Sequence, residues 1–222
     1  MTSFDLSGRC VLVTGGTRGI GAGIAGAFLA AGAHVLVCAR REPDRLPEAA
    51  GRRAAFVAAD VRDPEQAARL VESCLEGIGG LDVVVNNAGG APPGPAATTS
   101  PQRHAKVIDL NLLAPLHVAQ AANAVLQERP DGGSIIMIGS VSGVRPSPGT
   151  AAYGAAKAGL AHLATSLAVE WAPRVRVNTV VVGPAQTEPR AADAHYGGGA
   201  GLAAVARSVP LGRVASPQDV AA

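Results

Sequence analysis

Two residues with complementary chemistry lie four positions apart in the alanine-rich run 150–169: Tyr153 and Lys157. If this run is helical, residues four apart lie on one face, so the phenol and the ammonium point the same way. A free tyrosine has a pKa near ~10 and is a poor acid or base at neutral pH. A neighbouring ammonium favours the phenolate and lowers that pKa toward the working range of a general acid or base. The alternative is an ordinary helix with one aromatic core residue and one surface lysine, so the pair needs companions elsewhere in the chain.

The elements that must position this pair alternate between strand and helix along the whole chain. Short apolar runs rich in β-branched residues predict six strands, at 9–14, 33–38, 54–59, 81–85, 133–139 and 174–182. Helical patterns predict helices at 22–31, 63–78, 100–127 and 150–171, with a last helix beginning at Ser216 and Pro217. This alternation predicts a single α/β domain over residues 1–222, with a doubly wound, mainly parallel sheet between two layers of helices.

Four segments interrupt the pattern. We expect 42–51 to be a short helix with loops, and 90–99 to be a loop because of its glycines and prolines. Asn111 and Pro115 are expected irregular points inside the long helix 100–127. After the sixth strand, a segment with the glycine run 197–201 is expected to be mobile, either as a lid over a site or as a surface loop.

A glycine-rich turn stands between the first strand and the first helix, with the spacing Thr14-Gly15-x-x-x-Gly19-x-Gly21. Glycines there permit a tight turn and let backbone N–H groups approach a phosphate at the helix N-terminus. Its place after the first strand, together with the acid Asp60 at the end of the third, favours a dinucleotide site over an ordinary glycine turn.

The end of the second strand predicts the type of dinucleotide. Sites selective for NAD usually place an acid there against the ribose hydroxyls. This chain has Ala39 and Arg40 at that point and Arg18 in the glycine turn. Two guanidiniums without a carboxylate favour the 2′-phosphate of NADP(H), so we expect NADP(H) over NAD(H). The alternative is that both arginines are ordinary solvated surface residues.

Composition excludes several other classes of protein. Hydrophobic residues make up 48% of the 222 residues and charged residues 16%, as in a packed globular protein. The formal net charge of +2 is too small to indicate binding to nucleic acid or to a membrane surface, and no apolar run reaches the ~20 residues of a membrane span. Cys10, Cys38 and Cys74 are isolated, which suits a reducing compartment and shows no metal-ligand spacing. We therefore expect a cytoplasmic protein without a metal site.

Taken together, these motifs resemble the short-chain dehydrogenase/reductase family, and the resemblance covers essentially the whole chain. The family consists of Rossmann-fold oxidoreductases that use NAD(P), so it implies hydride transfer between NADP(H) and an alcohol or carbonyl substrate. The motifs that carry the resemblance are Thr14-Gly-Gly-Thr-Arg-Gly-Ile-Gly21, Asp60-Val61, Asn86-Asn-Ala-Gly89, Asn111, Ser140 and Tyr153-x-x-x-Lys157.

The resemblance implies a catalytic role for four residues. Ser140 would hydrogen-bond the substrate oxygen, and Tyr153 would pass a proton to or from it. Lys157 would bind the nicotinamide ribose and lower the pKa of the tyrosine, while Asn111 would hold a water at the end of a proton relay. Such an arrangement is physically reasonable, because a hydroxyl donor and an acidified phenol stabilise the charge that develops on a carbonyl oxygen during reduction. Ser142, in the same loop, is the alternative to Ser140.

The resemblance also implies a cofactor site at the ends of the strands. Asp60 and the backbone of Val61 would hold the adenine. Other groups expected there, besides Tyr153 and Lys157, are Gly15, Thr17, Arg18, Gly19, Ile20, Gly21, Arg40, Asn87, Ala88, Gly89, Gly183, Ala185 and Thr187.

The sequence departs from the family pattern in two places. After the sixth strand the family usually has Pro-Gly, whereas this chain has Val182-Gly183-Pro184. Family members also continue for a few tens of residues beyond Ala222, through a seventh strand and an Asp-Gly-Gly-like turn. We therefore expect a chain truncated relative to the family, without the seventh strand and with the sixth as an exposed sheet edge.

Two hypotheses about function follow. The first is an NADP(H)-dependent oxidoreductase acting on a small alcohol or ketone, and the second is a catalytically idle dinucleotide-binding or regulatory protein. The family further implies a homodimer or homotetramer formed through the two long helices. The substrate itself is not predicted; the walls of its pocket would be 90–99, 141–150 and 184–209, with candidate contacts from Arg145, Gln186, Glu188, Arg190 and Tyr196.

Overall fold

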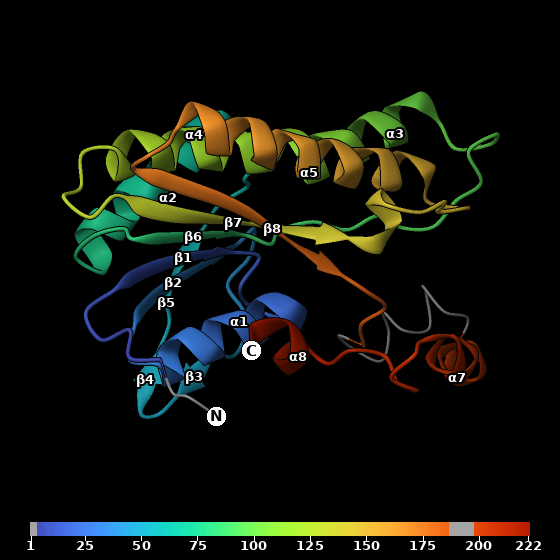
Figure 1. Ribbon diagram of the computed structural model, residues 1–222, viewed down its shortest axis with the longest axis horizontal. Helices are drawn as coiled ribbons and strands as arrows, with labels where there is room; N and C mark the ends of the chain where they lie inside the picture. The colour runs from blue at the N-terminus through green and yellow to red at the C-terminus, as the bar shows by residue number, and fades with distance from the viewer. Residues whose placement is uncertain (1–3, 187–197) are drawn as a thin grey trace.

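The six strands predicted from the sequence form one parallel sheet in a computed structural model that describes residues 4–186 and 198–222 (Figure 1). Their order is β5-β2-β1-β6-β7-β8, so the chain winds outward from β1 on one side and then outward from β6 on the other. This is the doubly wound arrangement predicted above. The strands are β1 (Cys10–Thr14), β2 (His34–Ala39), β5 (Ala55–Ala58), β6 (Val83–Asn86), β7 (Gly133–Ser140) and β8 (Val175–Val182).

Helices cover both faces of the sheet, which gives the three predicted layers (Figure 1). Successive side chains of a strand point to opposite faces. Leu12 accordingly packs with the helices of one face, whereas Val11 and Val13 pack with those of the other. The first face is covered by α2 (Pro64–Gly77), α4 (Ala114–Leu126) and α5 (Ala151–Glu170), and the second by α1 (Gly19–Ala30) and α8 (Pro217–Ala221). Among the described helices, none is long and apolar enough to cross a membrane.

The predicted helix starts are confirmed by their caps. Asp63 accepts hydrogen bonds from the backbone N–H groups of Glu65 and Gln66 at the start of α2, with a proline at the first helical position. Ser216 and Asp219 form a reciprocal capping box at the start of α8.

The long helix 100–127 is interrupted where the sequence predicted irregularity. It consists of α3 (Pro101–Ile108), a π-helical turn (Asp109–Leu113) and α4. Asn111 lies at the centre of the π turn and is completely buried. Such turns widen a helix by one residue and are frequent at functional sites.

One of the expectations for irregular segments is wrong. The predicted short helix at 42–51 is absent; the segment instead enters a small hairpin of β3 (Glu48–Ala49) and β4 (Arg52–Arg53). Its two turn residues, Ala50 and Gly51, have φ of 50° and 73°, the left-handed conformation that tight hairpins require. The glycine run expected to be mobile belongs from Gly198 onward to α7 (Gly198–Ser208), because the Leu- and Ala-rich sequence that follows favours a helix. Residues 187–197 of the same segment lie outside the described residues, and its mobility stays a prediction.

β8 is an edge strand, as predicted. It pairs with β7 along all eight residues, and no other strand pairs with it in the described parts of the chain. On one face of β8, Val175 and Val177 are buried; on the other, Arg176, Asn178 and Val180 are exposed. Beyond β8, a parallel bridge between Ala185 and Ala215 leads to α8.

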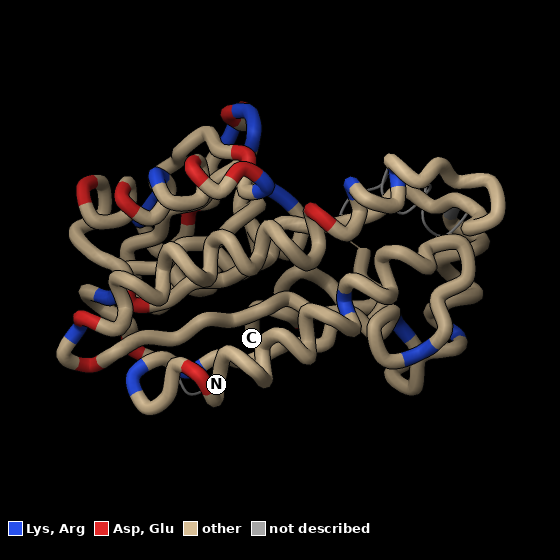
Figure 2. The backbone as a smooth tube through the Cα atoms, turned by 90° about the horizontal axis from the view of Figure 1, so that it is seen from above, with Lys and Arg blue, Asp and Glu red and all other residues tan. Residues whose placement is uncertain are grey.

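Charged side chains are unevenly distributed over the molecule. In the described regions, Lys and Arg predominate at the end that holds α7, where few Asp or Glu are seen (Figure 2). In a parallel sheet every strand ends at the same side, so the turns after β1, β2, β5, β6 and β7 lie together there. These turns contain the predicted site residues.

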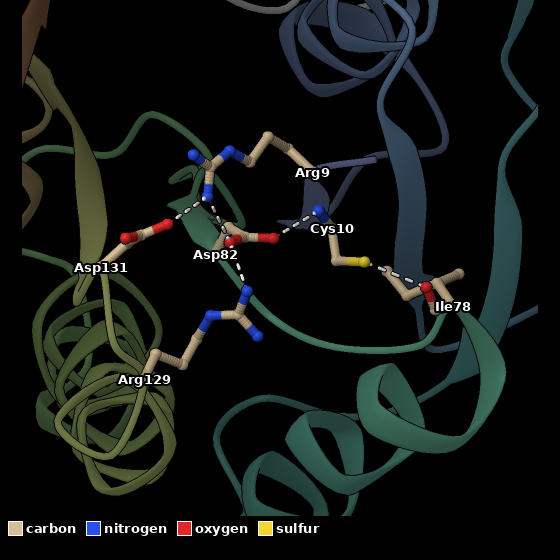
Figure 3. A network of polar contacts seen from close by, with 6 residues as sticks. All are labelled: Arg9, Cys10, Ile78, Asp82, Arg129 and Asp131. Atoms are coloured by element: carbon tan, nitrogen blue, oxygen red, sulfur yellow. Dashed lines mark hydrogen bonds and ion pairs between the residues drawn. The ribbon is translucent and has the colours of Figure 1, made fainter. Parts of the chain in front are cut away.

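At the other edge of the sheet, where the strands begin, a buried carboxylate links neighbouring segments. Asp82 accepts hydrogen bonds from Arg9 Nη1 at 3.1 Å, the Cys10 N–H at 2.8 Å and Arg129 Nη2 at 2.7 Å (Figure 3). Its side chain is 7% exposed, so it links β1, β6 and the segment before β7 out of contact with most solvent. Removing one partner of a buried ion pair leaves the other charge uncompensated.

Asp82→Asn should therefore lower the free energy of unfolding by about 1.5–3 kcal/mol, because the charge-assisted hydrogen bonds of a buried carboxylate are lost while the guanidiniums of Arg9 and Arg129 stay 46% and 32% exposed to water. Urea unfolding curves would measure the change. The control is Asp131→Asn, which removes a carboxylate that is 73% exposed and 3.5 Å from the same Arg9; it should cost no more than about 1 kcal/mol. Equal losses in the two variants would show that Asp82 does not have the role described.

Candidate active site

The glycine turn after β1 gives α1 an open N-terminus. Gly15 and Gly19 have φ of 61° and 53°, a conformation that other residues rarely adopt. Arg18 precedes the helix without a side-chain cap, and the first turn of α1 contains no acid. The first N–H groups of a helix have no intrahelical partner, so this end of α1 offers donors and a positive dipole end to an anion.

The turn after β6 is fastened to the glycine turn. The buried hydroxyl of Thr14 accepts hydrogen bonds from the N–H groups of Asn87 and Ala88, each at 3.0 Å. The Asn87 amide returns two hydrogen bonds, to the carbonyl oxygens of Thr14 at 2.8 Å and Gly15 at 3.1 Å. These hydrogen bonds thus bring the predicted residues Asn87, Ala88 and Gly15 next to one another.

The turn after β5 offers one acceptor and one donor side by side. The Asp60 carboxylate is partly exposed. Its neighbour Val61 is buried, and the described residues form no hydrogen bond to the Val61 N–H. The two groups therefore suit a ligand edge that presents a donor beside an acceptor, as the six-membered ring of a 6-aminopurine does.

The predicted arginines stand at the same side of the sheet. Arg40 follows the last residue of β2, Ala39, and Arg18 precedes α1; both are exposed. Arg40 is close enough to Asp60 to contribute, after Arg62, to lowering the pKa of that carboxyl. The described residues thus fit a dinucleotide phosphate: donors at α1, and cations around them.

Asn111 uses all the hydrogen-bonding capacity of its side-chain nitrogen. Its Nδ2 donates to the carbonyl oxygens of Gly90 and Val107, both at 2.9 Å, and its Oδ1 accepts from the Gly90 N–H at 2.8 Å. The side chain therefore holds the loop after β6 against the π turn. Its Oδ1 keeps one lone pair, so a water in a proton relay would be held by that oxygen or by main-chain atoms at this position.

Ser140 and Ser142 differ in their partners. Ser140 ends β7, and its hydroxyl oxygen accepts from the Ser142 N–H at 3.1 Å, so its own proton is left to be donated elsewhere. The Ser142 hydroxyl instead accepts from Ser147, which is 2.6 Å from the hydroxyl of Thr150. Both hydroxyls keep a proton to donate, so the preference for Ser140 rests on its place at the end of β7, where ligands gather on open α/β sheets.

Tyr153 and Lys157 lie together on α5, as their spacing predicted. The Lys157 ammonium lies 5.8 Å from the centre of the Tyr153 ring. The lysine is only 4% exposed, and it donates to the carbonyl oxygen of Ile138 in β7 at 2.7 Å. Burial lowers its pKa from 10.5 to about 8, so it is not the surface lysine of the alternative interpretation.

Gly89 is the point where the separate elements of the site converge. A Cβ added to Gly89 would lie 2.7 Å from Asn111 Oδ1 and 3.5 Å from Lys157 Nζ. The turn after β6, the π turn and α5 therefore meet within a few ångströms, and a side chain at position 89 would disturb all three.

The turn after β8 is only partly placed. Gly183 is exposed, and Ala185 bridges to Ala215. Of the candidate substrate contacts, Arg145 is exposed, and Gln186 donates its N–H to the carbonyl oxygen of Ala215. The remaining candidates, Thr187, Glu188, Arg190 and Tyr196, lie outside the described residues.

Sequence reasoning missed two residues of this region. The fastening role of the Thr14 hydroxyl was missed, although a polar residue at the end of a buried strand was a visible signal. Arg62, which holds the Asp60 carboxylate, was also missed, and only its position two residues after that acid could have suggested it.

The fold and the open glycine turn define a Rossmann-like α/β protein. Residues 9–195 match the family model described as short chain dehydrogenase. The chain therefore belongs to the short-chain dehydrogenase family, whose members use NAD(P) cofactors.

Relatives and solved structures agree with this assignment. The chain is 40% identical over 227 residues to an uncharacterized oxidoreductase of Mycobacterium tuberculosis, which covers 99% of this chain and 84% of that protein. It is 37% identical over 225 residues to 3beta-hydroxysteroid dehydrogenase 1 of Eggerthella lenta, a match that covers 98% of this chain and 85% of that protein. The crystal structure of a dehydrogenase/reductase from Sinorhizobium meliloti 1021 matches with a TM-score of 0.85 at 33% identity, covering 99% and 87% of the two chains.

Gly21→Ala should disrupt the junction between the glycine turn and the β6 turn. A Cβ at Gly21 would lie 2.3 Å from the Gly15 carbonyl oxygen and 2.5 Å from Asn87 Nδ2. We expect a loss of about 1–3 kcal/mol in urea unfolding, as for other overpacked sites. The control is Gly26→Ala in the same helix, where a Cβ would meet nothing within 4 Å; it should stabilise by about 0.5–1 kcal/mol. Equal changes in the free energy of unfolding for the two variants would contradict a close approach of the β6 turn to Gly21.

Burial of Lys157 should make stability depend on pH. Because its pKa is lowered from 10.5 to about 8, the unfolded chain binds more protons than the folded one between these values. The free energy of unfolding should therefore rise with pH across this window, by up to about 3 kcal/mol. The measurement is the difference in unfolding free energy between wild type and Lys157→Met at pH 7.5, 9 and 10.5. A difference that stays constant with pH would mean that the ammonium is well solvated.

Proposed function

We propose that this protein is an oxidoreductase that transfers a hydride between NADP(H) and an alcohol or carbonyl substrate, with Tyr153 as the general acid and base. The observation that carries the proposal is the buried Lys157 ammonium, held by the Ile138 carbonyl oxygen beside the tyrosine ring. A charge buried at this cost on one face of α5 is of little use to the fold, but it favours the phenolate form of its neighbour. The β6 turn and the π turn converge on the same lysine at Gly89.

The proposed chemistry assigns each group one task. When bound, the nicotinamide supplies or accepts the hydride. Ser140 donates its hydroxyl proton to the substrate oxygen, and Tyr153 gives or takes the proton of that oxygen as charge develops on it. Lys157 stabilises the phenolate and binds the nicotinamide ribose. Asn111 fixes the π turn, whose main chain holds the water that exchanges protons with Lys157.

The cofactor preference is proposed from charge. The end of β2 lacks an acid, and Arg18 and Arg40 are exposed on either side of the glycine turn. A 2′-phosphate adds negative charge to the adenine ribose, and guanidiniums bind phosphate oxygens with two parallel hydrogen bonds. Asp60 and the Val61 N–H are proposed to hold the adenine at the neighbouring strand end.

The remaining assignments follow from exposed surfaces and thiols. The proposed substrate is a small alcohol or ketone that lies between the loops 90–99 and 141–150. Along the outer face of α5, Ala155, Ala158 and Val169 are exposed, and small side chains permit close helix packing, which supports a homodimer or homotetramer through this helix. The three cysteines are buried free thiols, as suits a reducing cytoplasm.

Tyr153→Phe should abolish turnover and leave cofactor binding intact, because it removes only the phenolic oxygen. In a screen of NADPH oxidation over aldehydes, ketones and quinones, we expect the rate to fall by about 10²–10⁴-fold. Calorimetric titration with NADPH and NADH should show tighter binding of NADPH, unchanged within about threefold in the variant.

Three outcomes would contradict parts of this proposal. A wild-type protein that binds neither cofactor is not an oxidoreductase of this kind. Binding without turnover on any substrate of the screen would favour an idle dinucleotide-binding protein. Retained turnover in Tyr153→Phe would remove the tyrosine from the acid and base role.

A further inference from the structure

The Asp60 carboxylate is held by a guanidinium fork from Arg62. Arg62 Nε donates to Oδ1 at 2.9 Å and to Oδ2 at 3.2 Å, Nη2 donates to Oδ2, and the Arg62 backbone N–H donates to Oδ1 at 3.2 Å. Three donors thus make four hydrogen bonds, because Nε is shared between the two oxygens. An ionised carboxylate accepts about four hydrogen bonds, so a fourth donor can take one of the two positions that Nε shares. The carboxylate is also partly exposed, so a ligand can reach that position.

The turn that carries this fork is itself anchored to α2. The Asp60 N–H donates to Gln66 Oε1 at 2.9 Å, and the Gln66 amide donates to Asp63 Oδ2 at 2.8 Å. Asp63 in turn caps the helix. The backbone of residues 60–63 is therefore fixed, and the direction in which the Asp60 side chain points depends on the fork.

The fork also fixes the protonation state of the acid. The hydrogen bonds from the Arg62 side chain lower the pKa of the Asp60 carboxyl, with a smaller contribution from the charge of Arg40. Asp60 is therefore an acceptor only, and it stands beside the Val61 N–H, a donor to which the described part of the chain offers no acceptor. A 6-aminopurine presents an amine donor next to a ring-nitrogen acceptor, which matches this pair. A 6-oxopurine presents the reverse and does not match.

We propose that Arg62 is a positioning residue for cofactor recognition: its fork aims the Asp60 carboxylate so that the site selects a 6-aminopurine dinucleotide over its 6-oxopurine counterpart. The proposal rests on the proposed function, since it concerns the same cofactor site. Its alternative is a surface ion pair that contributes little, as most exposed pairs do. The two differ because only a positioning residue alters the choice between the two purines.

The test is calorimetric titration with NADP⁺ and with its hypoxanthine analogue, in which the amine is replaced by an oxygen. Wild type should bind NADP⁺ at least about tenfold more tightly, since one hydrogen bond to a charged group is lost in the analogue. Arg62→Gln should weaken NADP⁺ binding by about fivefold or more and leave the affinity for the analogue unchanged. Asp60→Asn should also reduce the preference, because an amide can donate to the oxygen of the analogue.

Two further variants separate the fork from other effects of a lost charge. Arg69→Gln removes an arginine that pairs with Glu65 on the exposed side of α2, and it should leave both affinities as in wild type. Arg62→Lys keeps the positive charge but not the planar fork, so it should restore only part of the preference. Melting temperatures of all variants would show that each remains folded.

The outcomes distinguish this inference from the function on which it rests. If wild type binds neither dinucleotide, the proposed function fails and this inference with it. If wild type prefers NADP⁺ but Arg62→Gln keeps the full preference, or loses affinity for both ligands equally, only the role of Arg62 is refuted. Complete restoration by Arg62→Lys would assign the effect to charge alone and would equally refute the fork.

Discussion

The hydroxyl of Thr14 holds together the two turns on which the rest of the candidate site depends. It is 1% exposed, and it accepts hydrogen bonds from two successive N–H groups, those of Asn87 and Ala88. The Asn87 amide closes the junction by donating to the Thr14 and Gly15 carbonyl oxygens. The Asn87 N–H also donates to the Val85 carbonyl oxygen at 3.1 Å, but the Ala88 N–H has no other partner among the described residues, and a buried donor left unpaired costs about 1–3 kcal/mol. The same bonds that satisfy the strand ends therefore determine where a ligand meets the backbone.

This junction positions the other elements of the candidate site. Gly89 ends the β6 turn and lies against both Asn111 and Lys157, so the junction determines how α5 and the π turn approach each other. Lys157 is then buried, and the Ile138 carbonyl oxygen compensates part of the loss of hydration. A buried ammonium is a cost to stability, which a structural role alone does not explain. The proposed role in tuning the Tyr153 phenol would account for it, because the electrostatic effect is strong where water is excluded.

Much of this arrangement could be predicted because it depends on local sequence. The Asp63 cap, the capping box at Ser216 and the alternation of strands with helices each follow from residue types at short spacings. The hairpin of β3 and β4 could not be predicted in the same way. Ala50 adopts a left-handed φ of 50°, which few non-glycine residues do, and the local sequence does not indicate this conformation. α7 was not predicted either, because its glycines disfavour a helix and the helix formed despite them.

The candidate site shows the same division between local and long-range information. That Tyr153 and Lys157 share a face could be predicted from their spacing. The burial of Lys157 depends on β7, which packs against α5 only in the folded chain. The Arg62 fork is local, yet its importance depends on the neighbouring strand end, which brings Arg40 close to Asp60. Spacing therefore predicts which residues can act together, and the fold decides which charges are exposed to ligand.

The open donors of this site have a thermodynamic consequence for the whole molecule. The first N–H groups of α1 lack a side-chain cap, and the Val61 N–H has no partner among the described residues. Capping typically contributes about 1 kcal/mol to a helix, so leaving α1 uncapped forgoes stability that evolution readily supplies at α2 and α8. An anionic ligand at these donors would recover that free energy, and it would stabilise the folded state in proportion to the logarithm of its concentration. Stability and ligand binding are thus coupled through the same few backbone groups.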